Sequence, residues 1–185
     1  MLELRTAIVR AAASGGSVEL PGSLRTVVLV EGVSDLAAVE AAAQIVKADL
    51  RDVVIVPMGG AMSIRRFVPL LTGVRILGLC DIAEREHFER AGVESIFTCD
   101  PDLEGELIRA LGYVGVMDVI NAVGDKAAFQ VFQNQPAQRN RPLGVLLHRF
   151  FGTIGGRKEK YGRALAAALP QGHLPQPLLQ LLDAL

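Results

Sequence analysis

A short run of apolar residues at positions 26–30, with the sequence TVVLV, constrains the fold of this chain more than any other feature. A strand without polar alternation is typical of a parallel sheet that is covered on both faces. The run ends on Glu31, turns at Gly32, and brings Asp35 into the start of an alanine-rich helix. Ligands of open α/β sheets bind at the carboxyl ends of the strands. The run therefore predicts an acidic site at the edge of a parallel sheet.

Strand and helix signals alternate along the first part of the chain. Strands are predicted at 25–30, 52–57, 74–80 and 95–99, and the helices between and after them at 34–48, 62–71, 82–91 and 101–112. Ser34 is the predicted N-cap of the first of these helices. This alternation predicts an α/β fold, with a four-stranded, mainly parallel sheet flanked by helices and joined by right-handed crossovers.

The second part of the chain contains helix signals only, at 118–133, 142–151, 158–169 and 173–185. A further helix is predicted at residues 2–13, where Gly15 and Gly16 end it. We therefore predict three parts: an N-terminal helix at 1–16, an α/β core at 25–113 and a helical extension at 114–185.

Composition excludes several classes of protein. The net charge is −1, so the chain lacks the overall basic balance of a protein that binds nucleic acid by bulk charge. Its two cysteines, Cys80 and Cys99, each end an apolar run and are predicted to be reduced core residues, without a disulfide or a zinc site. No export signal or membrane-spanning run is present, which predicts a cytoplasmic protein without membrane contact.

Acidic residues follow three of the four predicted strands. These residues are Glu31, Asp35, Asp81, Asp102 and Glu104. Because the carboxyl ends of parallel strands share one edge, we expect the five carboxylates to converge. Such a site without histidine or thiolate suits Mg²⁺ or Mn²⁺. Taken singly, Asp35, Asp81 and Asp102 could also be helix caps.

Glycine-rich segments are candidate sites for binding phosphate. The Gly59-Gly60 pair is either a simple turn or a place where the backbone approaches a phosphate. The chain has no GxGxxG after its first strand, and the segment 152–158 does not fit GxxxxGK[ST]. We therefore expect no ATP hydrolysis.

A basic segment lies in the helical half, between residues 139 and 163. It holds seven basic residues against the single acid Glu159: Arg139, Arg141, Arg149, Arg157, Lys158, Lys160 and Arg163. The segment is either the solvated face of a helix or a local site for a polyanion. Its few aromatic residues, Phe150, Phe151 and Tyr161, give weak support for base stacking.

The order of these motifs resembles a known family. Glu31 to Asp35 with the sequence EGVSD, then Gly59-Gly60, then Asp81, resembles the TOPRIM domain of topoisomerases, primases, small nucleases and recombination mediators. Asp102 and Glu104, followed by the segment 156–164, are more narrowly similar to the TOPRIM half of OLD (overcoming lysogenization defect) nucleases. The resemblance implies a Rossmann-like TOPRIM core.

The resemblance also implies roles for individual residues. Glu31 would be a metal ligand or general acid/base, and Asp35, Asp81, Asp102 and Glu104 would be metal ligands. Lys158 or Lys160 would steady the scissile phosphate. The second aspartate of the family's DxD motif falls on Ala83, so one carboxylate is missing, and Glu84 is a candidate substitute.

Our hypothesis is a nuclease that uses Mg²⁺ or Mn²⁺ to cleave DNA by a two-metal mechanism. The predicted nucleic-acid-binding residues are Arg139, Arg141, Arg157, Lys158, Lys160, Arg163, Gly59 and Gly60. OLD nucleases usually carry an ABC-type ATPase, so the resemblance implies that this domain either works alone or has a separate ATPase as its partner. A homodimer is a further candidate assembly. The alternative is a TOPRIM module that binds nucleic acid or recruits partners without cutting. Nucleotidyl transfer is a third hypothesis for the function.

Overall fold

A four-stranded parallel sheet forms the centre of the fold. The computed structural model describes all 185 residues, and its strands are β1 (Thr26–Val30), β2 (Val53–Pro57), β3 (Arg75–Asp81) and β4 (Ser95–Cys99). Their order in the sheet is β2-β1-β3-β4, and every neighbouring pair is parallel. The predicted α/β fold with a parallel sheet is therefore confirmed.

The central strand β1 is buried on both faces, as its apolar sequence predicts. Val28 and Val30 belong to a hydrophobic core of 33 buried residues. Val27 and Leu29 point to the opposite face and join a second core of 15 buried residues. Alternate side chains of one strand therefore anchor two separate helical layers.

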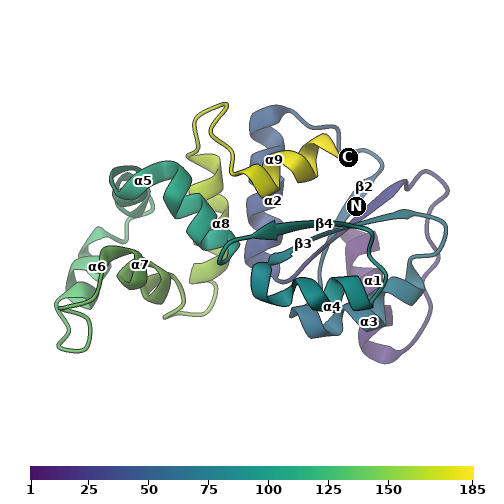
Figure 1. The fold of residues 1–185 in the computed structure, drawn as a ribbon, viewed down its shortest axis with the longest axis horizontal. Helices are drawn as coiled ribbons and strands as arrows, with labels where there is room; N and C mark the ends of the chain where they lie inside the picture. The colour runs from purple at the N-terminus through teal and green to yellow at the C-terminus, as the bar shows by residue number, and fades with distance from the viewer.

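Helices cover both faces of the sheet (Figure 1). The smaller core lies under α1 (Leu2–Ser14), α3 (Ile64–Phe67) and α4 (Arg85–Arg90). Short 3₁₀ turns flank α3 at Ala61–Ser63 and Val68–Leu70, and another at Ile82–Glu84 precedes α4. The larger core includes α2 (Val33–Val46), which connects β1 to β2 on the opposite face.

The rest of the chain is helical and extends beyond the carboxyl ends of the strands (Figure 1). It contains α5 (Leu103–Ala122), α6 (Lys126–Gln133), α7 (Leu143–Phe151), α8 (Arg157–Ala167) and α9 (Gln176–Asp183). The helix α8 packs along α2, and α9 returns to contact β3 and β4. One continuous core therefore joins the helical half to the sheet.

Two helix boundaries differ from the sequence prediction. The helix predicted to end near residue 112 continues as α5 to Ala122, with a kink at Gly112, whose φ is 66°. The helix predicted at 118–133 is interrupted after Ala122, and α6 begins at Lys126. The proposed boundary between residues 113 and 114 falls within α5, beside the kink, and the three-part division stays a prediction.

None of the helices combines the length and the apolar character that crossing a membrane requires. Cys80 and Cys99 are both buried and unpaired, as predicted. Burial raises the pKa of the Cys80 thiol to about 12, and the nearby Glu31 and Asp81 carboxylates add to this rise.

Candidate metal and nucleic-acid site

The switch point of the sheet lies between β1 and β3. The chain leaves β1 toward β2 on one side and later returns to β3 on the other, which opens a crevice at the carboxyl ends of these strands. Glu31 directly follows β1, and Asp81 is the last residue of β3. Oε1 of Glu31 accepts a hydrogen bond from the backbone N–H of Asp81 at 2.8 Å. The two strand ends are thus joined at the crevice.

Asp35 is positioned by the first turn of α2. Its Oδ2 accepts a hydrogen bond from the backbone N–H of Gly32 at 2.8 Å. Gly32, with extended backbone angles, is the N-cap of this helix. The prediction of Ser34 as the N-cap was therefore wrong, because the helix begins directly after the glycine turn.

Asp102 and Glu104 come from the start of α5. Asp102 is the N-cap, and its Oδ1 accepts a hydrogen bond from the N–H of Gly105 at 2.7 Å. Pro101, predicted in the first helical turn, instead precedes this cap. Glu104 is buried, and its Oε1 makes no hydrogen bond. The ammonium group of Lys158 lies 3.4 Å from this oxygen, which is an ion pair without hydrogen-bond geometry.

The Gly59-Gly60 pair forms the turn after β2. Its φ angles are 73° and 118°, which favour glycine over residues with a Cβ. The N–H of Gly60 donates to the carbonyl oxygen of Glu31 at 2.9 Å, so the turn is fastened to the residue that follows β1. Both glycines also border the crevice, so the turn is part of the site wall.

These segments enclose one pocket of ≈ 270 Å³, which we call the acidic pocket. Its lining includes all five predicted acids, both glycines and one lysine: Glu31, Asp35, Asp81, Asp102, Glu104, Gly59, Gly60 and Lys158. The structure therefore brings together the acids that the sequence places far apart. Their assignment as metal ligands stays a prediction.

The carboxylates of the acidic pocket are hard to ionise together. Burial raises the pKa of Asp81 to about 7, and the charges of Glu31, Asp35 and Asp102 contribute to the rise. Burial also raises the pKa of Glu31 and of Asp35. The backbone N–H that donates a hydrogen bond to each carboxylate lowers its pKa, but burial has the larger effect. Clustered carboxylates with raised pKa values are the electrostatic situation that a bound cation relieves.

The donor set suits a hard divalent cation. Carboxylate oxygens line the acidic pocket, and the buried Oε1 of Glu104 lacks a hydrogen-bond donor. However, no three His, Cys, Asp or Glu side chains are already arranged as a metal-binding group. The residues therefore fit Mg²⁺ or Mn²⁺ by chemistry, and binding would require some of their side chains to move.

Lys158 reaches the acidic pocket because α8 approaches α2 very closely. A Cβ on Gly162 would lie 2.5 Å from the backbone oxygen of Ser34, so only glycine permits this contact. Lys158 is one turn before Gly162 and shares its face of the helix. Burial lowers the pKa of the Lys158 ammonium group, but attraction to Glu104, Asp35 and Asp81 outweighs burial and raises it overall.

His148 is a site residue that the sequence analysis missed. Its Nδ1 lies 3.4 Å from Oε2 of Glu104 and 3.8 Å from Oδ2 of Asp102. Bonding to Glu104 raises the pKa of this imidazole. The lining of the acidic pocket itself contains no histidine, so His148 contacts two of its acids from outside the pocket. A single histidine in the apolar helix α7 carries no motif, so no sequence signal could have identified it.

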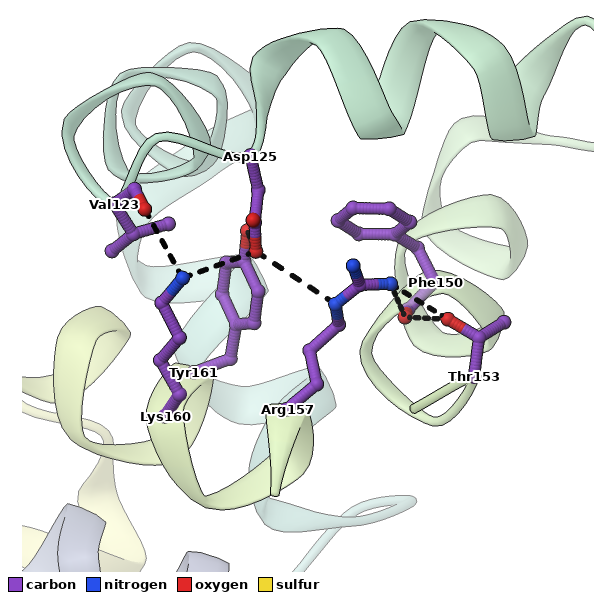
Figure 2. A network of polar contacts seen from close by, with 7 residues as sticks. All are labelled: Val123, Asp125, Phe150, Thr153, Arg157, Lys160 and Tyr161. Carbon is purple, nitrogen blue, oxygen red and sulfur yellow. Dashed lines mark hydrogen bonds and ion pairs between the residues drawn. The ribbon is translucent and has the colours of Figure 1, made fainter. Parts of the chain in front are cut away.

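Lys160 and Arg157 are absent from the lining of the acidic pocket, and both side chains point toward Asp125 instead (Figure 2). The Lys160 ammonium group contacts the Val123 carbonyl oxygen at 3.1 Å and Asp125 Oδ2 at 3.3 Å. Arg157 Nε lies 3.7 Å from the same Asp125 oxygen, and its guanidinium group lies over the Phe150 ring at 4.2 Å. The Tyr161 hydroxyl donates to that oxygen at 3.1 Å. Lys160 and Arg157 therefore hold α8 against the short segment between α5 and α6.

Arg163 is likewise paired within the fold. Its guanidinium group lies 2.9 Å from Oε2 of Glu40 in α2, and Arg5 of α1 contacts Oε1 of the same carboxylate at 2.7 Å. Arg139 and Arg141 differ, because their Nε atoms donate only to the backbone carbonyls of Asn134 and Ala137. Of the predicted nucleic-acid-binding residues, Arg139 and Arg141 form no ion pair, and Lys158 is the basic residue that lines the acidic pocket.

Glu84, the candidate substitute for the missing carboxylate at Ala83, stays a prediction. Its side chain lies 3.4 Å from His87 Nε2, within the helix that follows, and it is absent from the lining of the acidic pocket. Asp102 and Glu104, from the neighbouring strand end, lie in the lining instead.

The parallel sheet and the acids at its switch point define an α/β protein with a ligand crevice at the carboxyl ends of its strands. Residues 24–81 match the family model "overcoming lysogenization defect protein-like, TOPRIM domain". Residues 24–81 are therefore similar to an OLD-like TOPRIM domain, and the resemblance predicted from the sequence is confirmed.

Solved structures share the fold beyond the matched segment. The C-terminal region of the Burkholderia pseudomallei OLD protein has a TM-score of 0.63 and 19% identity, covering 86% of this chain and 96% of that one. The C-terminal region of the Xanthomonas campestris pv. campestris OLD protein has a TM-score of 0.61 and 23% identity, covering 86% and 93%. Comparison with curated protein sequences gives no match. The helical half is thus part of the shared fold.

Proposed function

We propose that this chain is a nuclease that cleaves DNA phosphodiester bonds in the acidic pocket with the help of Mg²⁺ or Mn²⁺. The observation that carries the proposal is the convergence of five acids and Lys158 from separate elements on one pocket. The OLD-like TOPRIM match supports it, because that domain implies a metal-binding, nuclease-type protein.

The carboxylates would hold the metal. Five of them provide enough oxygen ligands for two ions, the arrangement used in two-metal phosphodiester hydrolysis. The five carboxylates belong to Glu31, Asp35, Asp81, Asp102 and Glu104. Divalent cations bound there would supply Lewis-acid stabilisation of phosphate charge and lower the pKa of a bound water. Glu31 is held in place by the Asp81 N–H, so its carboxylate keeps a fixed position in the pocket wall.

Lys158 would bind the substrate phosphate. Its ammonium group is the one cation in the lining of the acidic pocket, and its raised pKa keeps it protonated. A positive charge fixed where negative charge develops stabilises a transition state. Lys160, the other candidate from the sequence, is bonded to Asp125 and does not line the acidic pocket, which supports Lys158 for this role.

Cleavage of supercoiled plasmid tests the proposal. We expect the purified protein to nick or degrade DNA in Mg²⁺ or Mn²⁺ and to be inactive in EDTA. Glu31→Gln keeps an oxygen that accepts from Asp81 and should lose at least about a hundredfold in rate, within the range of losses seen when one electrostatic group is removed from a site. Glu94→Gln is the matched control, because Glu94 is exposed and precedes β4 at the opposite edge of the sheet. Equal activity in both variants would refute the proposal.

A TOPRIM module that binds nucleic acid without cutting is the second candidate. Two observations favour it: Ala83 occupies a position where the family has aspartate, and the acids are not already arranged as a metal-binding group. DNA binding by a protein that neither cuts DNA nor binds Mn²⁺ would support this alternative.

Partners belong to the proposal as well. A separate ABC-type ATPase would complement the nuclease-type domain, and a homodimer would present two acidic pockets to one duplex. Co-purification with a tagged chain and sedimentation of the isolated chain test these two assemblies.

A further inference from the structure

A second pocket adjoins the acidic pocket and shares Asp102 with it. This pocket has a volume of ≈ 770 Å³ and lies between α5 and α7. Apolar walls come from Pro101, Ile108 and Val145, and His148 stands beside Asp102 on the border with the acidic pocket. A mostly apolar cavity of this size with a few polar groups is typical of a site for a small organic group.

Tyr113 is the only aromatic residue of the chain with an exposed side chain, and it lines this pocket. Its exposed fraction is 51%, whereas Phe150, Phe151 and Tyr161 are at most 1% exposed. Those three residues pack on one another, with Phe151 stacked on Tyr161 at 4.2 Å between ring centroids. The aromatic residues considered for base stacking therefore belong to the core, and Tyr113 is the ring available to a ligand.

The backbone around the pocket keeps the Tyr113 ring in this position. Gly112, with its φ of 66°, breaks the helical path of α5 immediately before the tyrosine. The Tyr113 hydroxyl lies 3.2 Å from the place where a Cβ on Gly144 would be. Because Gly144 lies in the first turn of α7, the ring spans the space between the two helices that form the pocket.

A cation without a carboxylate partner completes the pocket. Arg149 donates from Nε to the side-chain oxygen of Gln138 at 3.1 Å, and no carboxylate lies within ion-pair distance of it. Arg109, by contrast, is paired with Glu106 at 3.1 Å. An unpaired guanidinium group beside an exposed aromatic ring provides both a phosphate contact and a stacking surface.

We propose that this second pocket binds an unpaired base of the nucleic acid whose backbone occupies the acidic pocket. The inference rests on the proposed function and adds the substrate class: a single-stranded or frayed strand, with one base stacked on Tyr113 and a phosphate near Arg149. The shared wall at Asp102 places the base site next to the phosphate site.

Binding of hairpin DNA with a short single-stranded tail at either end tests this proposal, because the duplex fixes the register of the tail. Anisotropy is measured in Ca²⁺ with the Glu31→Gln protein, while an abasic residue is moved along the tail. One position should weaken binding roughly tenfold, as expected for loss of one stacked base. Adding Tyr113→Ala should abolish this dependence, whereas Tyr113→Phe and the exposed neighbour Val114→Ala should retain it.

The outcomes separate this inference from the proposed nuclease. If the abasic dependence is absent, or survives Tyr113→Ala, the base site is refuted even when plasmid is cleaved. If the dependence holds but the wild-type protein never cleaves DNA, the nuclease proposal fails and the base site stands. Failure to bind any of the hairpins would overturn the base site, whereas the nuclease proposal is decided by plasmid cleavage with the wild-type protein.

Discussion

The hydrogen bond from the Asp81 backbone N–H to Oε1 of Glu31, at 2.8 Å, joins the ends of the two central strands. It fixes an acid that has no packing role and directs it into the crevice at the switch point. The contact is made within the chain itself, so the pocket wall is preorganised before any cation or substrate binds. Glu31→Gln should therefore leave the fold unchanged.

Stability should depend on pH through Asp81. Its pKa in the fold is about 7, raised from 3.8 chiefly by burial, so the folded chain binds this proton more tightly than the unfolded chain does. The metal-free protein should consequently lose stability as the pH rises from about 4 to 7. Asp81→Asn removes this loss, so its melting temperature should exceed that of the wild type by more at pH 8 than at pH 5. Thermal melts in EDTA measure the difference, and a constant difference would contradict the explanation.

Gly162→Ala should weaken both stability and cleavage. The added Cβ would lie 2.5 Å from the Ser34 carbonyl oxygen, so α8 must move away from α2 and carry Lys158 with it. Overpacking of this kind costs about 1–3 kcal/mol, which exceeds the 0.5–1 kcal/mol that alanine gains over glycine in a helix. Urea denaturation and the cleavage rate report the two effects.

The matched control for this variant is Gly155→Ala. Gly155 precedes α8 and has no atom within 4 Å of an added Cβ. Its substitution should change neither the midpoint of unfolding nor the cleavage rate appreciably. Equal effects of the two alanine variants would show that close helix contact does not position Lys158.

The salt dependence of DNA binding should distinguish arginines without a carboxylate partner from arginines that are paired within the fold. Arg141 bonds only a backbone carbonyl, whereas Arg163 is paired with Glu40. Each phosphate contact contributes about 0.7–0.9 to the slope of log affinity against log salt. Arg141→Gln should therefore lower the slope by about one contact, and Arg163→Gln should leave it unchanged. The opposite ranking, measured by anisotropy across salt concentrations, would refute this division.

The sheet and the acidic pocket could be predicted because both depend on local sequence. An apolar run such as 26–30 indicates a parallel strand, and the position of a carboxylate directly after it fixes the sheet edge on which it lies. Gly59 and Gly60 line the same pocket for a related reason, because they also follow a strand. The rule for right-handed crossovers limits how parallel strands can be connected, but the order β2-β1-β3-β4 was not predicted from the sequence.

The basic segment was harder to interpret because its partners are distant in sequence. Asp125 and Glu40 lie outside residues 139–163, so a local charge count could not show that they neutralise Lys160 and Arg163. His148 was missed for the same reason, as its partners belong to α5. Pairing between helices is a tertiary property, and only the fold reveals which cations remain free.

Titration of Mn²⁺ into the metal-free protein, followed by calorimetry, tests the central claim most directly. The account predicts that the wild type and Glu94→Gln bind Mn²⁺ with the same affinity, whereas Glu31→Gln and Asp81→Asn bind it at least about tenfold more weakly, since each loses a charged ligand. Binding should also release protons near pH 7, because Asp81 is partly protonated there. Absence of Mn²⁺ binding by the wild type, or equal affinity in all four proteins, would contradict the claim that these acids form a metal site.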